Sequence, residues 1–178
     1  MHRMLTTLAL VLVLTLGAAA CGHASSEEAA DDSTVLVTAV DYGYEDLPSS
    51  VAAGTELTLT NDSDVELHEI VLVRIPADED RPVSELVTLP PEELFGLVMP
   101  NLVGVSLAPP NEDGMVVEGS LVVAEAGRYA LLCVIPTGAD PDEYMAAAED
   151  PDREGPPQVD GGPPHIVQGM FAELTVDA

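Results

Sequence analysis

Four side chains spread along the sequence could bind one metal ion together. His68 begins one apolar run, Cys133 ends another, and His165 and Met170 follow near the C-terminus with four residues between them. One thiolate, two imidazoles and one thioether are the donor set of a mononuclear type 1 copper site, in which two His and one Cys bind in a plane and Met lies farther away on the axis. The sequence therefore predicts one copper ion bound by His68, Cys133, His165 and Met170.

Each of these residues also has an ordinary structural interpretation. Cys133 on an apolar strand could be a small buried hydrophobe, and Met170 could fill space in the core. His165 could be a loop residue after two prolines, and His68 a hydrogen-bonded polar group. The donor types and their order in the chain favour a metal site when the four residues are taken together. Glu69 either supports His68 or faces solvent.

The charge of the chain limits its partners. The 178 residues carry 32 Asp and Glu against five Lys and Arg, a net charge of −27, and all five basic residues are arginines. Such a charge repels phosphate backbones and anionic lipid headgroups and attracts metal cations and basic protein faces. Nucleic acid is therefore excluded as a partner. A solvated acidic surface without any specific partner is the alternative explanation of the charge.

The N-terminus has the organisation of an export signal. A basic start precedes an apolar run over residues 5–16 and small residues before Cys21. This run is too short to span a bilayer, so residues 1–20 are predicted to be a signal peptide. Cys21 at this position resembles the acylated cysteine of lipoproteins, although Ala18 to Ala20 also suit ordinary cleavage. We expect a lipid on Cys21, a flexible acidic tether over 21–33, and a lipid anchor on the outer, periplasmic or extracellular, face of the cell membrane.

The remaining residues, 34–178, are long enough for one domain and read as short strands. Val- and Thr-rich runs separated by Gly, Pro, Asn and Asp turns predict an all-β, antiparallel sandwich. Strands are expected at 35–44, 55–60, 65–75, 115–123, 128–135 and 170–176. Two segments do not fit strands and are predicted insertions: the first insertion (76–114), with a short helix from Pro91, and the second insertion (136–164), with a helix capped by Asp140. The second is expected to lie on the surface, outside the sandwich core.

The mature chain resembles the cupredoxins, and plastocyanin-like members in particular. The resemblance covers most of 34–178 and is carried by Asp41-Tyr42-Gly43-Tyr44, Leu57-Thr58-Leu59-Thr60-Asn61 before His68, Ala126-Gly127-Arg128-Tyr129 before Cys133, and His165-Ile166-Val167-Gln168-Gly169-Met170 before the last strand. It implies a Greek-key β-sandwich with the four metal ligands on loops at one end. One departure is that 31 residues separate Cys133 from His165, where the family has only a few. Loop-closure cost grows only logarithmically with length, so this spacing does not forbid the site.

Two functions follow from these observations. The first is one-electron transfer or copper holding at the membrane surface, with a redox partner protein or a copper donor or acceptor as partner. The alternative is a metal-free cupredoxin-like module that recognises a partner through the two insertions. An enzyme is not expected. Multicopper oxidases need many histidines, and the mature chain has only three (His23, His68 and His165). It also lacks a phosphate-binding loop, a serine nucleophile elbow and a zinc signature.

Overall fold

The structure is a computed structural model that describes residues 34–150, 152 and 155–178. The predicted signal peptide (1–20), the lipidation site Cys21 and the tether to residue 33 lie outside the described residues. Within the described part of the chain, no helix is both long enough and apolar enough to cross a bilayer.

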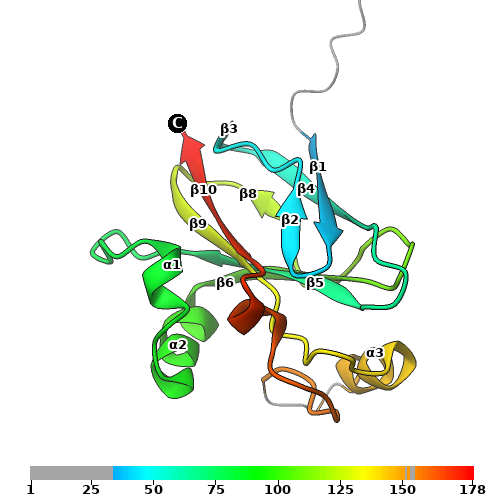
Figure 1. Ribbon diagram of the computed structural model, residues 1–178. Coiled ribbons are helices and arrows are strands. Elements are labelled where there is room, and N and C mark those ends of the chain that lie inside the picture. Colours follow the sequence, from blue (N-terminus) through cyan, green and yellow to red (C-terminus); the bar gives the residue numbers. More distant parts are fainter. Residues whose placement is uncertain (1–33, 151, 153–154) are drawn as a thin grey trace, which may run out of the picture.

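Two β-sheets form a sandwich, as predicted (Figure 1). The smaller sheet has the strand order β2 (Gly43–Glu45), β1 (Thr34–Val40), β4 (Thr55–Asn61) and β8 (Val122–Val123). The larger sheet has the order β3 (Ser50–Ala52), β10 (Phe171–Asp177), β9 (Gly127–Leu132), β5 (His68–Arg74), β6 (Leu102–Ala108) and β7 (Met115–Gly119). The short helices are α1 (Val83–Leu86), α2 (Pro91–Val98), η1 (Met99–Asn101), α3 (Pro141–Ala148) and η2 (His165–Gln168). The predicted all-β fold class with short helices in the insertions is confirmed.

The expectation of antiparallel pairing in the sandwich is wrong for two strand pairs. Strand β1 pairs with β4 in parallel, and β3 pairs with β10 in parallel. The chain leaves the smaller sheet after β2, forms β3 at the edge of the larger sheet and then returns as β4. Because of this crossover, β4 runs in the same direction as β1.

Another crossing between the sheets divides the strand that was predicted over 115–123. Strand β7 ends at Gly119, which has a φ of +59°, and β8 belongs to the other sheet. The chain then crosses back to β9, where the Tyr129 hydroxyl donates a hydrogen bond to the Glu125 carbonyl at 2.9 Å. A buried tyrosine bonded to the backbone a few residues upstream is typical of the corners of Greek-key sandwiches.

Strand β6 lies inside the first insertion, which was predicted to contain no strand. Its sequence is interrupted by Gly104, a residue that weakens a strand pattern. The glycine is required by packing, since a Cβ atom at this position would lie 2.3 Å from the Ser120 carbonyl oxygen. The first insertion therefore contributes a strand to the larger sheet as well as the predicted helix from Pro91.

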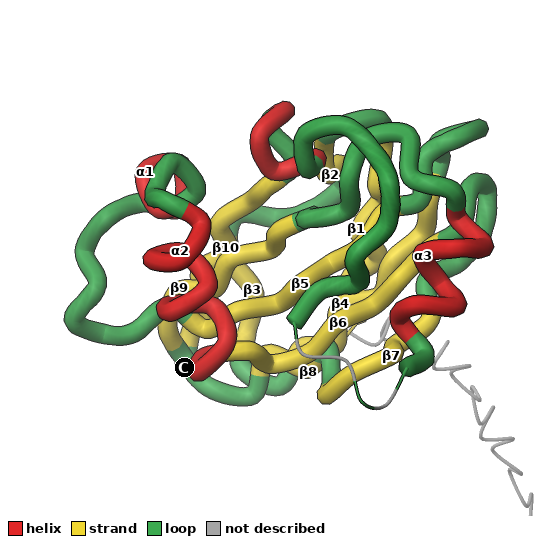
Figure 2. Tube along the Cα trace, turned by 90° about the horizontal axis from the view of Figure 1, so that it is seen from below, coloured by secondary structure: helices red, strands yellow, loops and turns green. Residues whose placement is uncertain are grey.

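Apolar side chains are buried on both faces of the larger sheet. Along β5, Ile70 and Leu72 enter the core between the sheets, whereas Val71 and Val73 belong to a second cluster with residues of α1 and α2. Figures 1 and 2 agree that α2 and α3 flank opposite sides of this outer face of the larger sheet. The apolar run that begins at His68 is therefore a strand buried on both faces.

The second insertion is not confined to the surface, which corrects the sequence-based expectation. Helix α3 begins as predicted, because the Asp140 carboxylate accepts a hydrogen bond from the Glu143 amide at 3.0 Å and Pro141 occupies the first turn. However, Ala139 and Tyr144 are buried in the main core, and Tyr144 is only 1% exposed. The prolines exclude this segment from the sheets, but its helix still packs against them.

Candidate metal centre

The four predicted ligands lie at the same end of the larger sheet. His68 begins β5, Cys133 follows β9 directly, His165 begins η2, and Met170 directly precedes β10. Strand β9 lies between β5 and β10, with Leu132 paired to both Val71 and Phe171. This register places the start of β5, the end of β9 and the start of β10 together. All four ligand candidates have an exposed fraction of 0%.

Three of the donor atoms form a compact group. One ligand atom each from His68, Cys133 and His165 lie within 4.8 Å of one another. The Cys133 Sγ atom is 3.3 Å from His165 Nδ1, and the two imidazole ring centres are 5.0 Å apart. Bonds from a first-row metal such as zinc to nitrogen and thiolate sulfur measure about 2.0–2.3 Å, so donors sharing one ion must lie within about 4–5 Å. The observed group meets this requirement.

Met170 is fixed next to this group by its backbone. The Cys133 amide donates to the Met170 carbonyl at 3.2 Å, and the Met170 amide donates to the His165 carbonyl at 3.1 Å. The buried side chain belongs to the same core cluster as Cys133. The structure therefore brings all four residues together, and their binding of a metal stays a prediction.

The base of the second insertion explains how two ligands so far apart in sequence can meet. The Ile166 amide donates to the Cys133 carbonyl at 2.7 Å, and the His165 amide donates to the Ile135 carbonyl at 2.9 Å. Thr137 then bonds to Pro163, and Gly162 bonds to Thr137. These contacts close the insertion at its base. Relative to a loop of four residues, closing 31 residues costs on the order of 2 kcal/mol, which a few such hydrogen bonds can offset.

Asn61 positions the loop that leads to His68. Its amide Nδ2 donates to the Glu66 carbonyl and to the Ala108 carbonyl, both at 2.8 Å, and its Oδ1 accepts from the Ser63 amide at 2.9 Å. Ala108 is the β6 residue paired with His68. The buried Asn61 side chain therefore joins the end of β4, the loop before β5 and the strand beside His68.

Buried nitrogen atoms of the two imidazoles lack hydrogen-bond partners among the described residues. These atoms are His68 Nδ1, His68 Nε2 and His165 Nε2. The nearest carboxylates are Asp41, 3.9 Å from His68 Nε2, and Glu66, 3.4 Å from His165 Nε2. The first distance is too long for a hydrogen bond, and the second contact lacks the required geometry. Each unsatisfied buried atom costs about 1–3 kcal/mol, a penalty that metal coordination would remove.

Burial also disfavours charge on the three donor residues. Burial, followed by the neighbouring His165, lowers the pKa of His68 to about 4, and burial lowers the pKa of His165. Burial, followed by the nearby Glu69, raises the pKa of the Cys133 thiol well above its usual value. Both imidazoles are consequently neutral and able to coordinate a metal at neutral pH. A thiolate at Cys133 requires a neighbouring cation that stabilises its charge.

Two acidic side chains of the loop and strand around His68 support the centre. Glu66 is only 8% exposed, and its Oε2 accepts from the Gly138 amide at 3.0 Å while it faces His165. Glu69 is 3% exposed, and its Oε1 accepts from the Val134 amide, next to Cys133, at 2.9 Å. Glu69 therefore supports the centre, which is one of the two interpretations left open by the sequence.

Glu66 and Tyr42 are contacts that the sequence reasoning missed. The Tyr42 ring lies edge-on to His165, with ring centres 5.1 Å apart, and its hydroxyl donates to Glu66 at 3.3 Å. Tyr42 has a φ of +64°, a strained value for a tyrosine, at the turn after β1. The one available signal for Glu66 was its place two residues before His68, within the strand predicted over 65–75.

Comparison with known proteins gives only distant similarity. No family model matches the chain, and no curated protein matches it. Among solved structures, the chain is similar to an auracyanin from Roseiflexus castenholzii (18% identity, TM-score 0.45, covering 82% of this chain and 98% of that one). It is also similar to auracyanin A of Chloroflexus aurantiacus, described as a "blue" copper protein (18%, 0.41, 81% and 98%), and to auracyanin B (18%, 0.41, 82% and 88%). Because these superpositions are loose, the interpretation of the site depends on its own geometry.

The residues present fit a copper ion. A buried thiol, two neutral imidazoles and a neighbouring methionine match the donors of type 1 copper sites. The orphaned imidazole nitrogens and the high pKa of the thiol are both features that a bound cation would relieve. The arrangement can hold one soft metal ion in a dry environment.

Proposed function

We propose that this chain is a cupredoxin-type protein that binds one copper ion through His68, Cys133 and His165, with Met170 as a weaker axial donor. Its function is one-electron transfer or copper holding. The observation that supports this proposal most strongly is the group of three donor atoms within 4.8 Å of one another, all on fully buried side chains.

The donor types favour copper over harder cations. Thiolate and thioether ligands select copper, zinc or iron–sulfur groups, and a His₂Cys set with a weak axial Met is typical of copper that exchanges one electron. The protein keeps water away from the donors and holds Cys133, His165 and Met170 through backbone hydrogen bonds. Donors fixed in this way cannot rearrange freely when the charge of the centre changes.

The proposal extends to the location and partners of the protein. We expect export, a lipid on Cys21, and a domain held on the outer face of the cell membrane by the tether 21–33. The net charge of −27 favours a redox partner or copper donor with a basic docking face. The chain acts as a carrier and not as an enzyme.

Copper titration of the metal-free protein tests the central proposal. We expect one copper ion per chain and an intense visible band from charge transfer between thiolate and Cu(II). Cys133→Ser should abolish the band, because it removes the sulfur donor, even if some metal stays on the histidines. His68→Ala and His165→Ala should each weaken binding strongly, whereas Met170→Leu should keep the metal and change mainly the reduction potential.

A control variant is needed to separate loss of the sulfur donor from the structural effect of placing a serine in the buried strand region. Ala130 lies in the same strand region and is also buried, so Ala130→Ser provides a polar control that leaves all donors in place. The proposal is wrong if the folded wild-type protein takes up less than one ion in both oxidation states of copper, or if Cys133→Ser and Ala130→Ser bind copper equally well. The metal-free module that binds through its insertions would then replace it.

The proposed lipid anchor has a separate test. Cys21→Ser should block lipid attachment and release the protein from the membrane fraction, and labelled fatty acid should enter only the wild-type chain. Membrane retention of a cleaved Cys21→Ser protein, together with an unlabelled wild type, would contradict lipidation without affecting the copper proposal.

A further inference from the structure

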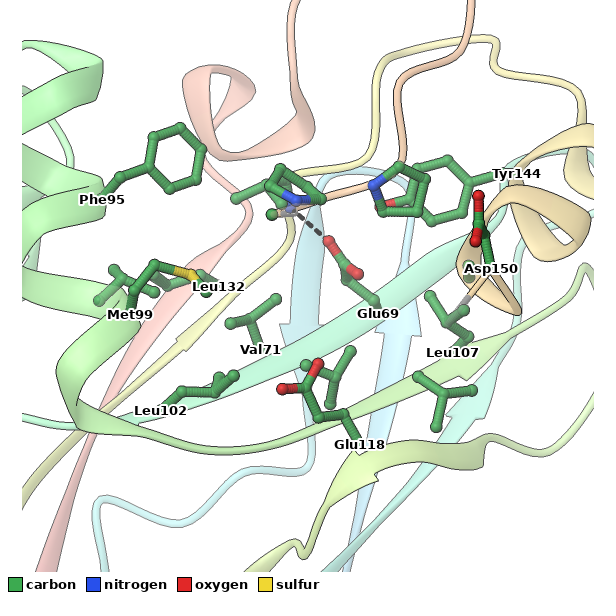
Figure 3. A pocket seen from close by; sticks show the side chains of 18 of the residues that line it. Glu69, Val71, Phe95, Met99, Leu102, Leu107, Glu118, Leu132, Tyr144 and Asp150 are labelled. Atoms are coloured by element: carbon green, nitrogen blue, oxygen red, sulfur yellow. Dashed lines mark hydrogen bonds between the residues drawn. The ribbon is translucent and has the colours of Figure 1, made fainter. Parts of the chain in front are cut away.

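Two buried glutamates next to the metal centre have different neighbours. Glu69 lines a cavity of about 620 Å³ on the outer face of the larger sheet, and Figure 3 shows the hydrogen bond that its carboxylate accepts from a backbone amide. Glu66 does not line this cavity. Its carboxylate lies against His165, with Oε2 3.4 Å from Nε2. Glu66 therefore faces a predicted metal ligand directly.

The Glu66 carboxylate is held in place by donors from distant segments. Its Oε2 accepts from the Gly138 amide at 3.0 Å, and its Oε1 accepts from the Tyr42 hydroxyl at 3.3 Å. The backbone of the same residue is also fixed, because its amide donates to Ser63 Oγ at 3.0 Å and its carbonyl accepts from Asn61. The side chain is only 8% exposed. The negative charge is thus fixed beside the centre and largely shielded from solvent.

These contacts determine which nitrogen of His165 carries the proton. Both carboxylate oxygens of Glu66 accept hydrogen bonds, and an ionised carboxylate can only accept. In the neutral imidazole, the nitrogen that faces this acceptor is therefore the protonated one, Nε2. The lone pair is then on Nδ1, and Nδ1 is the atom that lies 3.3 Å from Cys133 Sγ. The lone pair of His165 is directed toward the sulfur donor.

We propose that Glu66 is a positioning residue that keeps Nδ1 of His165 free for copper and whose charge favours Cu(II) over Cu(I). The inference rests on the proposed copper site. A ligand histidine that donates its other N–H group to a carboxylate is fixed in orientation and becomes a more basic ligand. Because Cu(II) carries one more positive charge than Cu(I), a buried carboxylate beside the ligand stabilises Cu(II) more.

The contact between His165 Nε2 and Glu66 Oε2 is longer than the roughly 2.7–3.2 Å of an ordinary hydrogen bond and is poorly aligned. A metal ion uses one nitrogen of each imidazole, so the second nitrogen needs a partner from the protein. Coordination at Nδ1 would withdraw electron density from the ring and make Nε2–H a stronger donor. Pairing with Glu66 is therefore favoured most when the ion is bound.

The isosteric substitution Glu66→Gln tests the role of the charge. The glutamine carbonyl can accept from both Gly138 and His165, and its NH₂ group can donate to the Tyr42 hydroxyl, so the contacts stay and only the charge is lost. Copper titrations in both oxidation states should show that Cu(II) affinity falls about tenfold more than Cu(I) affinity. This ratio corresponds to a reduction potential raised by about 59 mV for one electron, which voltammetry measures.

Asp64→Asn is the matched control for the general field of the protein. It removes the same charge from an exposed side chain two residues away, which accepts a hydrogen bond from Asn111. The ratio of Cu(II) to Cu(I) affinity should change by less than about twofold, because solvent screens exposed charges. Equal shifts in the two variants would overturn the role of the Glu66 charge. Equal weakening of both oxidation states in Glu66→Gln would also overturn it, since a purely structural role gives that result.

Nitrogen-15 NMR of the imidazole rings in the metal-free protein tests the orientation without copper. His165 should carry its proton on Nε2 in the wild type and in Glu66→Gln, and the Nδ1–H form should become detectable in Glu66→Leu if that variant folds. A proton on Nδ1 in the wild type, or an unchanged tautomer in folded Glu66→Leu, would overturn the positioning role and leave the copper proposal intact. A wild type that binds no copper would overturn the proposed function and the effect on the reduction potential, and the tautomer would still decide whether Glu66 orients His165.

Discussion

Asn61→Ala should destabilise the metal-free protein by about 3 kcal/mol. The Asn61 side chain is 3% exposed and makes three hydrogen bonds, at 2.8, 2.8 and 2.9 Å, to the backbone of Glu66, Ala108 and Ser63. Each such bond contributes about 1 kcal/mol, and alanine replaces none of them. The loss should also loosen the connection that positions His68 beside β6.

Urea unfolding followed by circular dichroism, with a chelator present, measures this loss. Asn101→Ala is the matched control, because the Asn101 side chain makes one hydrogen bond, to the Leu97 carbonyl at 2.8 Å, and should cost about 1 kcal/mol. If Asn61→Ala is no more destabilising than Asn101→Ala, the three bonds do not hold the loop before His68 in the way that the structure indicates.

Two further perturbations test the buried parts of the centre and of the second insertion. The pKa of His68 falls from 6.5 to about 4 on folding, chiefly through burial, so the unfolded chain binds a proton first as the pH drops. Protonation of His68 in the unfolded chain therefore lowers the free energy of unfolding of the metal-free protein as the pH falls. The effect is absent above about pH 6.5 and amounts to about 3 kcal/mol at pH 4 and below. Urea unfolding at pH 7 and pH 4.5 should show most of this loss in the wild type and a smaller loss in His68→Gln, and equal losses would contradict the assigned cause. Tyr144→Ala should destabilise the protein by about 3 kcal/mol or more, because it opens a cavity in the core, whereas the exposed Glu143→Ala should change stability by less than about 0.5 kcal/mol. Equal thermal melting of these two variants would show that α3 is dispensable to the core.

The parts of the fold that were predicted well from the sequence are those with a local sequence pattern. Alternating apolar residues located the strand at Leu57 and Leu59, and Asp140 followed by Pro141 located the start of α3. The types of the four donor residues and their order in the chain also selected them, and the structure groups ligand atoms of three of them, His68, Cys133 and His165, within 4.8 Å. The strand pattern and the helix start depend on residues close together in the chain.

The missed features depend on contacts between distant segments. Gly104 obscured β6, and its role is visible only when Ser120 is placed against it. Tyr144 could not be assigned to the core from its proline-rich and acidic surroundings, because its burial comes from the sheet beneath it. The contact of Glu66 with His165 likewise needs the loop that Asn61 holds and the base of the second insertion.

The metal-free centre weakens the fold that contains it. Three imidazole nitrogens are buried without hydrogen-bond partners among the described residues, and a thiol lies where its charged form is disfavoured. A sandwich built only for stability would have apolar side chains at these positions, because burying unpaired polar atoms is unfavourable. A cation at the centre would pair with these atoms, so part of its binding free energy would become folding free energy. The same buried donors that make the metal-free protein sensitive to acid should therefore make it measurably more stable when copper is bound.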